Sequence, residues 1–149
     1  MTDATDATDA TPPTPPAALD PDALLDAMPF TKTIGAVFSC YSKEEVRARL
    51  DWAPERCTAG GLLHGGAVMA LADSTGAACA FLNLPEGAAG TTTVESKTNF
   101  LRGVRDGHVE AISRPLHVGR TVVVVETDVR DPRDRLVARV LQTQLVLGA

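Results

Sequence analysis

The chain has 149 residues, of which 44% are apolar and 22% charged, and its formal net charge is −5. This length is enough for one domain with a sizeable core. The three cysteines are scattered along the chain and odd in number, which excludes a disulfide framework and a paired-thiolate metal site. Such cysteine usage is typical of a cytoplasmic protein, and the acidic balance argues against a nucleic-acid partner.

The acidity is confined to the first 30 residues, which hold six Asp and no Lys or Arg, whereas residues 31–149 carry a charge of +1. Residues 1–18 repeat Thr-Asp-Ala, continue into a Pro-rich run and contain no large apolar residue after Met1. We therefore predict a disordered acidic leader over 1–18 and a single domain over 19–149. The leader lacks the basic start and apolar stretch of a secretory signal.

The first part of the domain is predicted to change from helix to strand and back to helix. Asp20–Asp22 starts a short helix whose apolar residues share one face, and Pro29 stops it. Ile34–Trp52 has a β-like pattern, and residues 53–61 form a loop. Leu62–Leu84 is Ala-rich and apolar on all sides, which predicts a long helix buried around nearly its whole circumference.

Four strands separated by turn residues are predicted in the last third of the chain. Their short connections indicate antiparallel pairing in a four-strand meander. A long buried helix followed by such a meander indicates an α+β fold in which the sheet wraps around the helix. The run of valines at 122–125 needs cover on both faces, which indicates a partner subunit. The predicted strands are Thr91–Leu101, His108–Val118, Thr121–Val129 and Leu136–Leu147.

The long apolar helix is also long enough to be weighed as a membrane span. Asp73 lies in its middle, and a charge there costs about 2.5–3.5 kcal/mol on insertion. The many Ala and Gly residues insert weakly, and no basic segment flanks the helix. We therefore expect no membrane segment.

Two features of this helix carry the chemistry. Gly65 and Gly66 at its start leave backbone N–H groups open to a phosphate or to a developing oxyanion, or they only allow close packing. Asp73 is a general base, a nucleophile, or a structural residue bonded to a neighbouring loop. The eight residues between Gly65 and Asp73 span about 12 Å of helix. One carbonyl group cannot touch both, so a shared substrate requires two copies of the helix and a site at a dimer interface.

Four segments of the chain form a recognisable set: Leu63-His64-Gly65-Gly66, Leu71-Ala72-Asp73, Asn99-Phe100-Leu101-Arg102 and Val118-Gly119-Arg120. With these segments the chain resembles the hotdog-fold acyl-CoA thioesterases of the phenylacetate-pathway type, with the 4-hydroxybenzoyl-CoA thioesterases as relatives. The resemblance covers about residues 30–147. It implies a central helix wrapped by an antiparallel sheet, with the sheets joined across a homodimer and often a homotetramer of paired dimers. It also implies hydrolysis of an acyl-CoA to free acid and coenzyme A without a metal or redox cofactor.

The resemblance implies a role for each matched residue. The Gly65 amide would polarise the thioester carbonyl, and Asp73 of the facing subunit would attack it or activate water. His64 would orient the loop or touch the thioester, or it would only be a helix-start residue bonded to the backbone. Thr93 falls where relatives carry a water-positioning hydroxyl, although the two preceding threonines compete for that position. The implied substrate-binding residues are Thr58, Gly66, Phe100, Arg102, His117, Gly119, Arg120 and Thr121.

Two positions depart from the family pattern. Thr58 stands where relatives place an Asn or Gln, and Ala77 stands where some have a Thr. These departures leave open the acyl group, predicted as aryl or medium-chain, and the choice between base and nucleophile for Asp73. Two rival functions are an acyl-thioester hydratase or dehydratase of the same fold and a non-catalytic acyl-CoA-binding module. The expected partners are an acyl-CoA and further copies of the chain.

Overall fold

The structure is a computed structural model that describes residues 21–148, so the predicted leader over 1–18 lies outside the described residues. The helices are α1 (Pro21–Ala27), α2 (Pro29–Thr33) and α3 (Gly65–Leu82), with a 3-10 turn at Pro54–Arg56. The strands are β1 (Val37–Tyr41), β2 (Val46–Asp51), β3 (Gly90–Phe100), β4 (His108–Val118), β5 (Val122–Arg130) and β6 (Leu136–Leu147). The predicted long helix and the four last strands are confirmed with small shifts at their ends.

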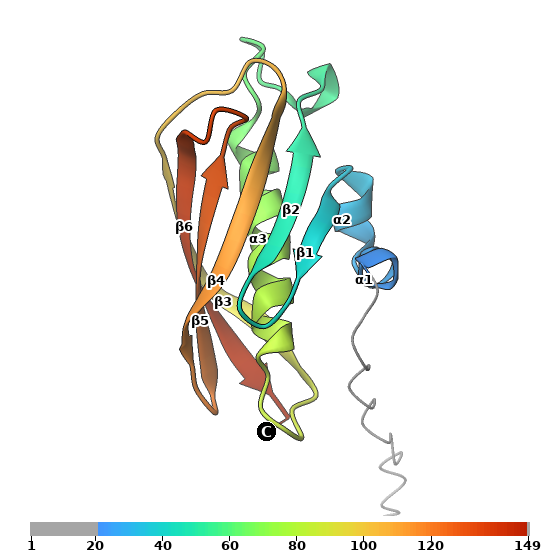
Figure 1. Ribbon diagram of the computed structural model, residues 1–149, viewed down its shortest axis with the longest axis vertical. Helices are drawn as coiled ribbons and strands as arrows, with labels where there is room; N and C mark the ends of the chain where they lie inside the picture. The colour runs from blue at the N-terminus through green and yellow to red at the C-terminus, as the bar shows by residue number, and fades with distance from the viewer. Residues whose placement is uncertain (1–20, 149) are drawn as a thin grey trace, which may run out of the picture.

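The two N-terminal helices lie against one side of the domain (Figure 1). The sequence predicted only that Pro29 would end the first helix, whereas Pro29 also occupies the first turn of α2. A proline is tolerated there because the N–H it lacks would have no partner within the helix. Leu24, on the predicted apolar face of α1, is buried in the core. Thr31 of α2 is fixed to α3 by a buried hydroxyl pair, with Thr31 Oγ1 at 2.7 Å from Ser74 Oγ.

The six strands form one antiparallel sheet in the order β1-β2-β4-β5-β6-β3. The predicted four-strand meander is therefore wrong in one respect: β4, β5 and β6 follow one another, but β3 pairs with β6 at the edge. The connection over residues 101–107 crosses one end of the domain, so that β4 returns beside β2 (Figure 1). This seven-residue connection passes the two strands that lie between β3 and β4, namely β6 and β5, which a two-residue hairpin cannot do.

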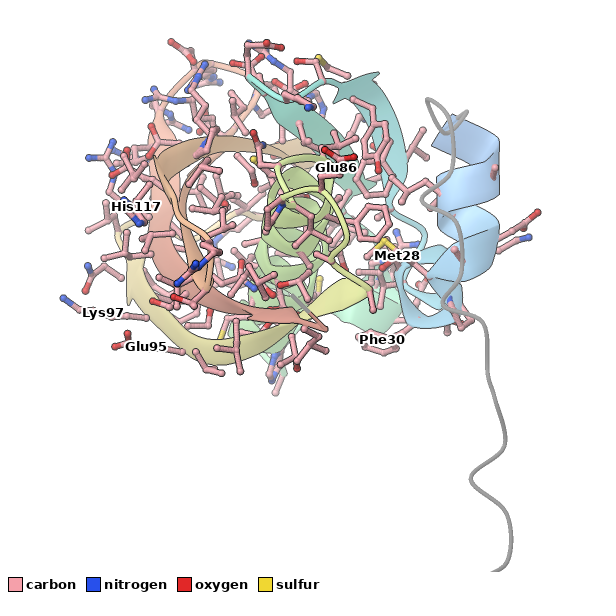
Figure 2. All side chains as sticks on the ribbon, turned by 90° about the horizontal axis from the view of Figure 1, so that it is seen from below. Met28, Phe30, Glu86, Glu95, Lys97 and His117 are labelled. Atoms are coloured by element: carbon pink, nitrogen blue, oxygen red, sulfur yellow. The ribbon has the colours of Figure 1, made fainter. Side chains whose placement is uncertain are left out.

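The sheet curves around α3 (Figure 2), and five of its strands, β2 to β6, pack against the helix. Leu71 of α3 and the inward-facing Val123 and Val125 of β5 are fully buried between the two layers. The prediction that α3 is buried on nearly all sides is wrong, because three of its residues are exposed along one face: Gly66, Met69 and Asp73.

By length and composition α3 could cross a membrane, with a mean hydropathy of 1.3. Half of its residues are nevertheless buried inside the domain, because it is the core helix of the sheet. Cover by a sheet explains its apolar character as well as a bilayer would.

The turn between β5 and β6, together with the first residues of β6, fixes the position of the segment that follows β3. The carboxylate of Asp131 accepts hydrogen bonds from Arg135 Nε and from the backbone N–H groups of Arg133 and Arg135, which lowers the Asp131 pKa to about 2. Just beyond this turn, Val137 O accepts from the N–H groups of Leu101 and Arg102. These bonds fix the residues after Phe100 beside the start of α3.

Candidate active site

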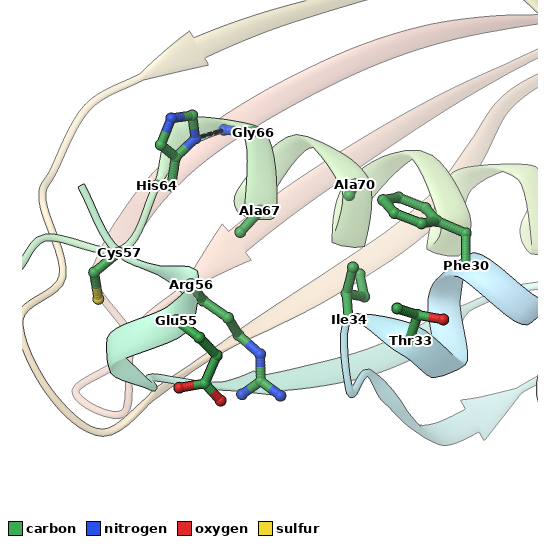
Figure 3. Close-up of a pocket in the computed structure, with 10 residues that line it drawn as sticks. All are labelled: Phe30, Thr33, Ile34, Glu55, Arg56, Cys57, His64, Gly66, Ala67 and Ala70. Carbon is green, nitrogen blue, oxygen red and sulfur yellow. Dashed lines mark hydrogen bonds between the residues drawn. The ribbon is translucent and has the colours of Figure 1, made fainter.

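The start of α3 presents one backbone donor that is capped and one that is not. His64 has the extended conformation of an N-cap residue, and its Nδ1 accepts from the N–H of Gly66 at 2.8 Å (Figure 3). Among residues 21–148 the N–H of the neighbouring Gly65 has no hydrogen-bond acceptor. The positive end of the helix dipole lies at the same place. The capping by His64 agrees with the reading of this residue as bonded to the backbone.

Three predicted binding residues line a cavity together with Gly65. This cavity has a volume of about 370 Å³ and is lined by Thr58, Gly65, Phe100 and Arg102, together with apolar residues of the neighbouring loops, of α3 and of β6. The ring of Phe100 lies against the helix start, and a Cβ on Gly65 would sit 3.2 Å from Phe100 Cζ. The absence of a side chain at Gly65 therefore allows an aromatic wall to stand directly beside the donor.

A second cavity, of about 400 Å³, opens on the other side of the helix start (Figure 3). It is lined by His64 and Gly66, by Ala70 one turn further, and by Phe30 of α2. Phe30 is 64% exposed, and Figure 3 shows it lying over α3 near Ala70. The sequence did not predict this wall, because it did not predict α2.

Asp73 lies on the exposed face of α3 and is not desolvated within one chain, contrary to the expectation of a fully apolar surrounding. Its Oδ1 accepts two hydrogen bonds, one from Thr93 Oγ1 at 3.2 Å and one from Gln142 Nε2 at 2.5 Å. Of the three consecutive threonines on β3, Thr93 is thus the one beside the carboxylate. Thr91 instead donates toward Gln144 Oε1 and Leu145 O.

Gln142 and Gln144 are functional candidates that the sequence reasoning missed. Both side chains are 0% exposed, although glutamine is seldom fully buried. They stand on the inward face of β6 between Val140 and Val146, where the alternation of the strand calls for apolar residues. Two polar residues in phase with that apolar face were a signal available in the sequence.

The second predicted group of binding residues lies at the opposite end of the sheet. The N–H of Val146 donates to Thr121 O, and Gly90 pairs with Leu147 at the same end. Phe100, beside the start of α3, lies ten residues further along β3, or roughly 33 Å for an extended strand. One chain therefore does not bring this group to the free Gly65 N–H. The residues concerned are His117, Gly119, Arg120 and Thr121.

A third cavity, of about 300 Å³, lies between α1 and α3. Its lining is almost entirely apolar and includes Leu24, Met28, Ala77 and Phe81. Ala77 follows Asp73 by four residues and so lies one helical turn away on the same face. An apolar group placed in this cavity would thus lie close to the carboxylate.

Two kinds of alternative chemistry find no support among the described residues. Burial raises the pKa of the Cys79 thiol to about 12, and the Cys57 thiol donates to Ala53 O, so neither is arranged as a thiolate nucleophile. Over residues 21–148 no group of three His, Cys, Asp or Glu side chains is placed to hold a metal ion.

The sequence pattern of the family described as the thioesterase superfamily matches residues 60–138, which include the helix start, Asp73 and most of the sheet. A candidate esterase of Mycobacterium tuberculosis, Rv1847, is 32% identical over 121 residues, covering 80% of this chain and 86% of that protein. The 1,4-dihydroxy-2-naphthoyl-CoA hydrolase of Escherichia coli is 37% identical over 76 residues, covering 51% of this chain and 55% of the enzyme.

The same family is found among solved structures. The crystal structure of thioesterase HI1161 from Haemophilus influenzae superposes with a TM-score of 0.82 at 25% identity, covering 89% of this chain and 93% of that one. The predicted α+β hotdog fold, with a central helix and an antiparallel sheet, is thereby confirmed. The chain belongs to the thioesterase superfamily and is a thioester hydrolase.

Proposed function

We propose that this protein is an acyl-CoA thioesterase, in which the Gly65 amide of one subunit and Asp73 of another act on the same thioester. The observation that carries the proposal is the N–H of Gly65 at the capped start of α3, which has no acceptor within the described part of the chain. A fixed donor at this place stabilises negative charge that develops on a carbonyl oxygen. The name of the E. coli relative, a CoA hydrolase, supports a CoA thioester as the substrate.

The reaction is a hydrolysis that needs no electron transfer and no metal. The carboxylate of Asp73 either attacks the carbonyl carbon or removes a proton from a water molecule that attacks it. In both cases the carbonyl oxygen becomes negative beside the Gly65 N–H, the C–S bond breaks, and coenzyme A leaves as a thiolate that takes up a proton. If Asp73 is the nucleophile, water then cleaves the anhydride that has formed on it.

Two copies of α3 are needed because Gly65 and Asp73 of one helix lie about 12 Å apart. Met69 is four residues from each of them and is 40% exposed on the same face. If two copies of α3 cross antiparallel at Met69, each Gly65 lies opposite the partner's Asp73. The small residues Gly66 and Ala70 on this side allow the close approach of two helices.

The edge strand β3 favours the same homodimer. No strand of the described range 21–148 lies at its outer edge, and most of its residues are exposed, including Val94. An unpaired edge of this length is a template for pairing with another strand. A second copy of β3 would continue the sheet and bury this edge. The exposed Leu141, Leu145 and Leu147 of β6 support a further, tetrameric contact.

Coenzyme A carries several phosphate charges, for which Arg102, His117 and Arg120 are the proposed partners. Arg102 lines the cavity at Gly65 of its own chain, whereas His117 and Arg120 lie at the other end of the sheet. They would therefore serve the site of another subunit. His117 points away from the body of the domain in Figure 2, where a neighbouring subunit can meet it.

The cavity beside Ala77 is proposed to hold the acyl group, since it is apolar and adjoins the Asp73 face. Its volume of about 300 Å³ suits an aryl or medium-chain acyl group. The aromatic acyl group in the name of the E. coli relative supports the aryl choice. The free cysteines Cys40, Cys57 and Cys79 support a cytoplasmic location, where thiols stay reduced.

The proposed function is tested by thiol release from a panel of aryl and aliphatic acyl-CoA thioesters. We expect hydrolysis by the wild type and its near-complete loss in Asp73→Asn, with CoA binding retained. Binding without turnover across the panel would favour a binding module, and addition of water to an enoyl thioester would favour a hydratase.

The shared site has its own test, the refolding of a mixture of Asp73→Asn and Gly65→Pro chains. Half of the randomly formed dimers are mixed, and each mixed dimer has one intact site, so about one quarter of the wild-type activity should return. If no activity returns although mixed dimers form, Gly65 and Asp73 do not act across the interface.

A further inference from the structure

The hydrogen bonds around Asp73 all have the same direction. The Gln142 amide donates its two protons to Asp73 Oδ1 and to Thr93 Oγ1, at 2.5 and 3.1 Å. Gln144 Nε2 donates to Thr93 Oγ1 at 2.8 Å. Thr93 has one proton and two lone pairs, so it accepts both of these bonds and gives its proton to Asp73 Oδ1 at 3.2 Å. The whole network therefore delivers donors to one carboxylate oxygen.

Gln142 is held in an arrangement that a purely structural residue would not need. Its Oε1 is buried and has no hydrogen-bond partner among residues 21–148. Reversing the amide would place this oxygen against the Asp73 carboxylate, so only the observed orientation is favourable. A buried acceptor without a donor lowers stability, and an apolar side chain of the same size would avoid that loss. What glutamine provides here, and an apolar side chain would not, is the N–H donor to Asp73 Oδ1.

Helix α3 has a glycine, and so no side chain, at the position that faces the Gln142 amide. Gly76 lies above the amide, and a Cβ at this position would collide with Gln142 Oε1. Glycine is the poorest helix former after proline, and here it occupies the interior of α3. Its presence is explained by the room that Gln142 requires to reach Asp73 from the sheet.

From this geometry, and on the basis of the proposed function, we propose that Gln142 is a positioning residue for Asp73. With two donors on Oδ1, the rotation of the carboxylate is fixed and Oδ2 is left as the oxygen that acts on the thioester or on water. Gln142 does not touch the substrate. It acts from the interior of its own subunit on a carboxylate that faces another subunit, with Gln144 and Thr93 as its support.

The test compares Gln142→Leu with Gln144→Leu, since both remove a buried amide of β6 but only Gln142 contacts Asp73. We expect Gln142→Leu to lower kcat roughly tenfold to a hundredfold, the usual effect of one hydrogen bond to a charged group, without changing KM or lowering the melting temperature. Gln144→Leu should lower kcat by less. An unchanged kcat in Gln142→Leu, or equal losses in both variants, would overturn the proposal.

A second variant, Gln142→Met, distinguishes destabilisation of the fold from misplacement of the Asp73 carboxylate. The methionine side chain is unbranched and fits irregular space. If both Leu and Met variants lose kcat only in proportion to a fall in melting temperature, Gln142 is structural and the proposal fails. Crystal structures of the wild type and Gln142→Leu give a readout that does not depend on turnover. We expect one Asp73 conformer in the wild type and a rotated or divided carboxylate in the variant. An unmoved carboxylate would contradict the positioning role even if the proposed function were wrong.

Discussion

At the start of α3 the N–H of Gly65 finds no acceptor in the described chain, whereas at the middle of the same helix one oxygen of the Asp73 carboxylate accepts from two donors. The first arrangement is local, since His64 caps Gly66 within two residues and leaves Gly65 free. The second is long-range, since Gln142 reaches Asp73 across 69 positions of sequence. The proposed site therefore has two halves. The helix-made half is the Gly65 N–H with its neighbouring His64 cap, and the sheet-made half is Asp73 with the donors that reach it from β3 and β6.

The sharpest way to test the helix-made half is Gly65→Pro. Proline fits the first position of a helix, and the extended conformation of His64 is the one favoured before proline, so the substitution removes little more than the N–H. We expect kcat to fall by about 10²- to 10³-fold, as for the loss of one oxyanion donor.

The matched control is Gly65→Ala, which keeps the N–H and adds a Cβ beside Phe100. It should retain most of the activity, as measured by steady-state thiol release, with circular dichroism to verify the fold. Equal losses in the two variants would mean that crowding against Phe100, rather than the missing donor, inactivates the enzyme.

Arg120→Ala tests the proposed coenzyme A-binding residues, which belong neither to the helix-made half nor to the sheet-made half. Because Arg120 is proposed to bind the phosphates of coenzyme A and not the reacting carbonyl, KM should rise roughly tenfold with kcat nearly unchanged. The exposed Arg133 in the β5–β6 turn provides a control for the loss of one positive charge. If Arg120→Ala and Arg133→Ala have the same KM, Arg120 does not bind the substrate.

The smallest expected effect concerns the cap of the helix-made half. His64→Ala should lower the free energy of unfolding by about 1 kcal/mol, because Gly66 loses its acceptor. His64→Asn supplies another N-cap acceptor and should restore both stability and kcat, as measured by urea unfolding and thiol release. A stable but inactive Asn variant would show that the imidazole itself contacts the substrate.

The helix-made half could be predicted from sequence, and the sheet-made half could not. The geometry of the His64-Gly65-Gly66 segment depends only on residues adjacent in sequence, because capping and an open helix start are local features. The spacing of Gly65 and Asp73 likewise follows from the rise of a helix. The partners of Asp73 depend instead on which strand lies under α3, and that is decided by the register of β6 against β3.

The errors in the fold have the same origin. The strand limits were predicted well, since alternation and turn residues are local signals. The place of β3 beside β6, and not beside β4, depends on the path of the 101–107 connection. The second helix was missed because a proline marks both the end of one helix and the first turn of the next. The exposure of Asp73 was missed because its neighbours in sequence are apolar, whereas the open face follows from where the sheet ends.

The edge position of β3 has a consequence for how the protein is made. β3 ends at Phe100, but the strand with which it pairs ends only at Leu147. At translation rates of about 5–20 residues per second, roughly two to ten seconds pass between the synthesis of the last residue of β3 and that of the last residue of β6. During this time the apolar face of α3 lacks part of its cover, so the newly made chain is most open to aggregation and to chaperones just before its last strand is synthesised.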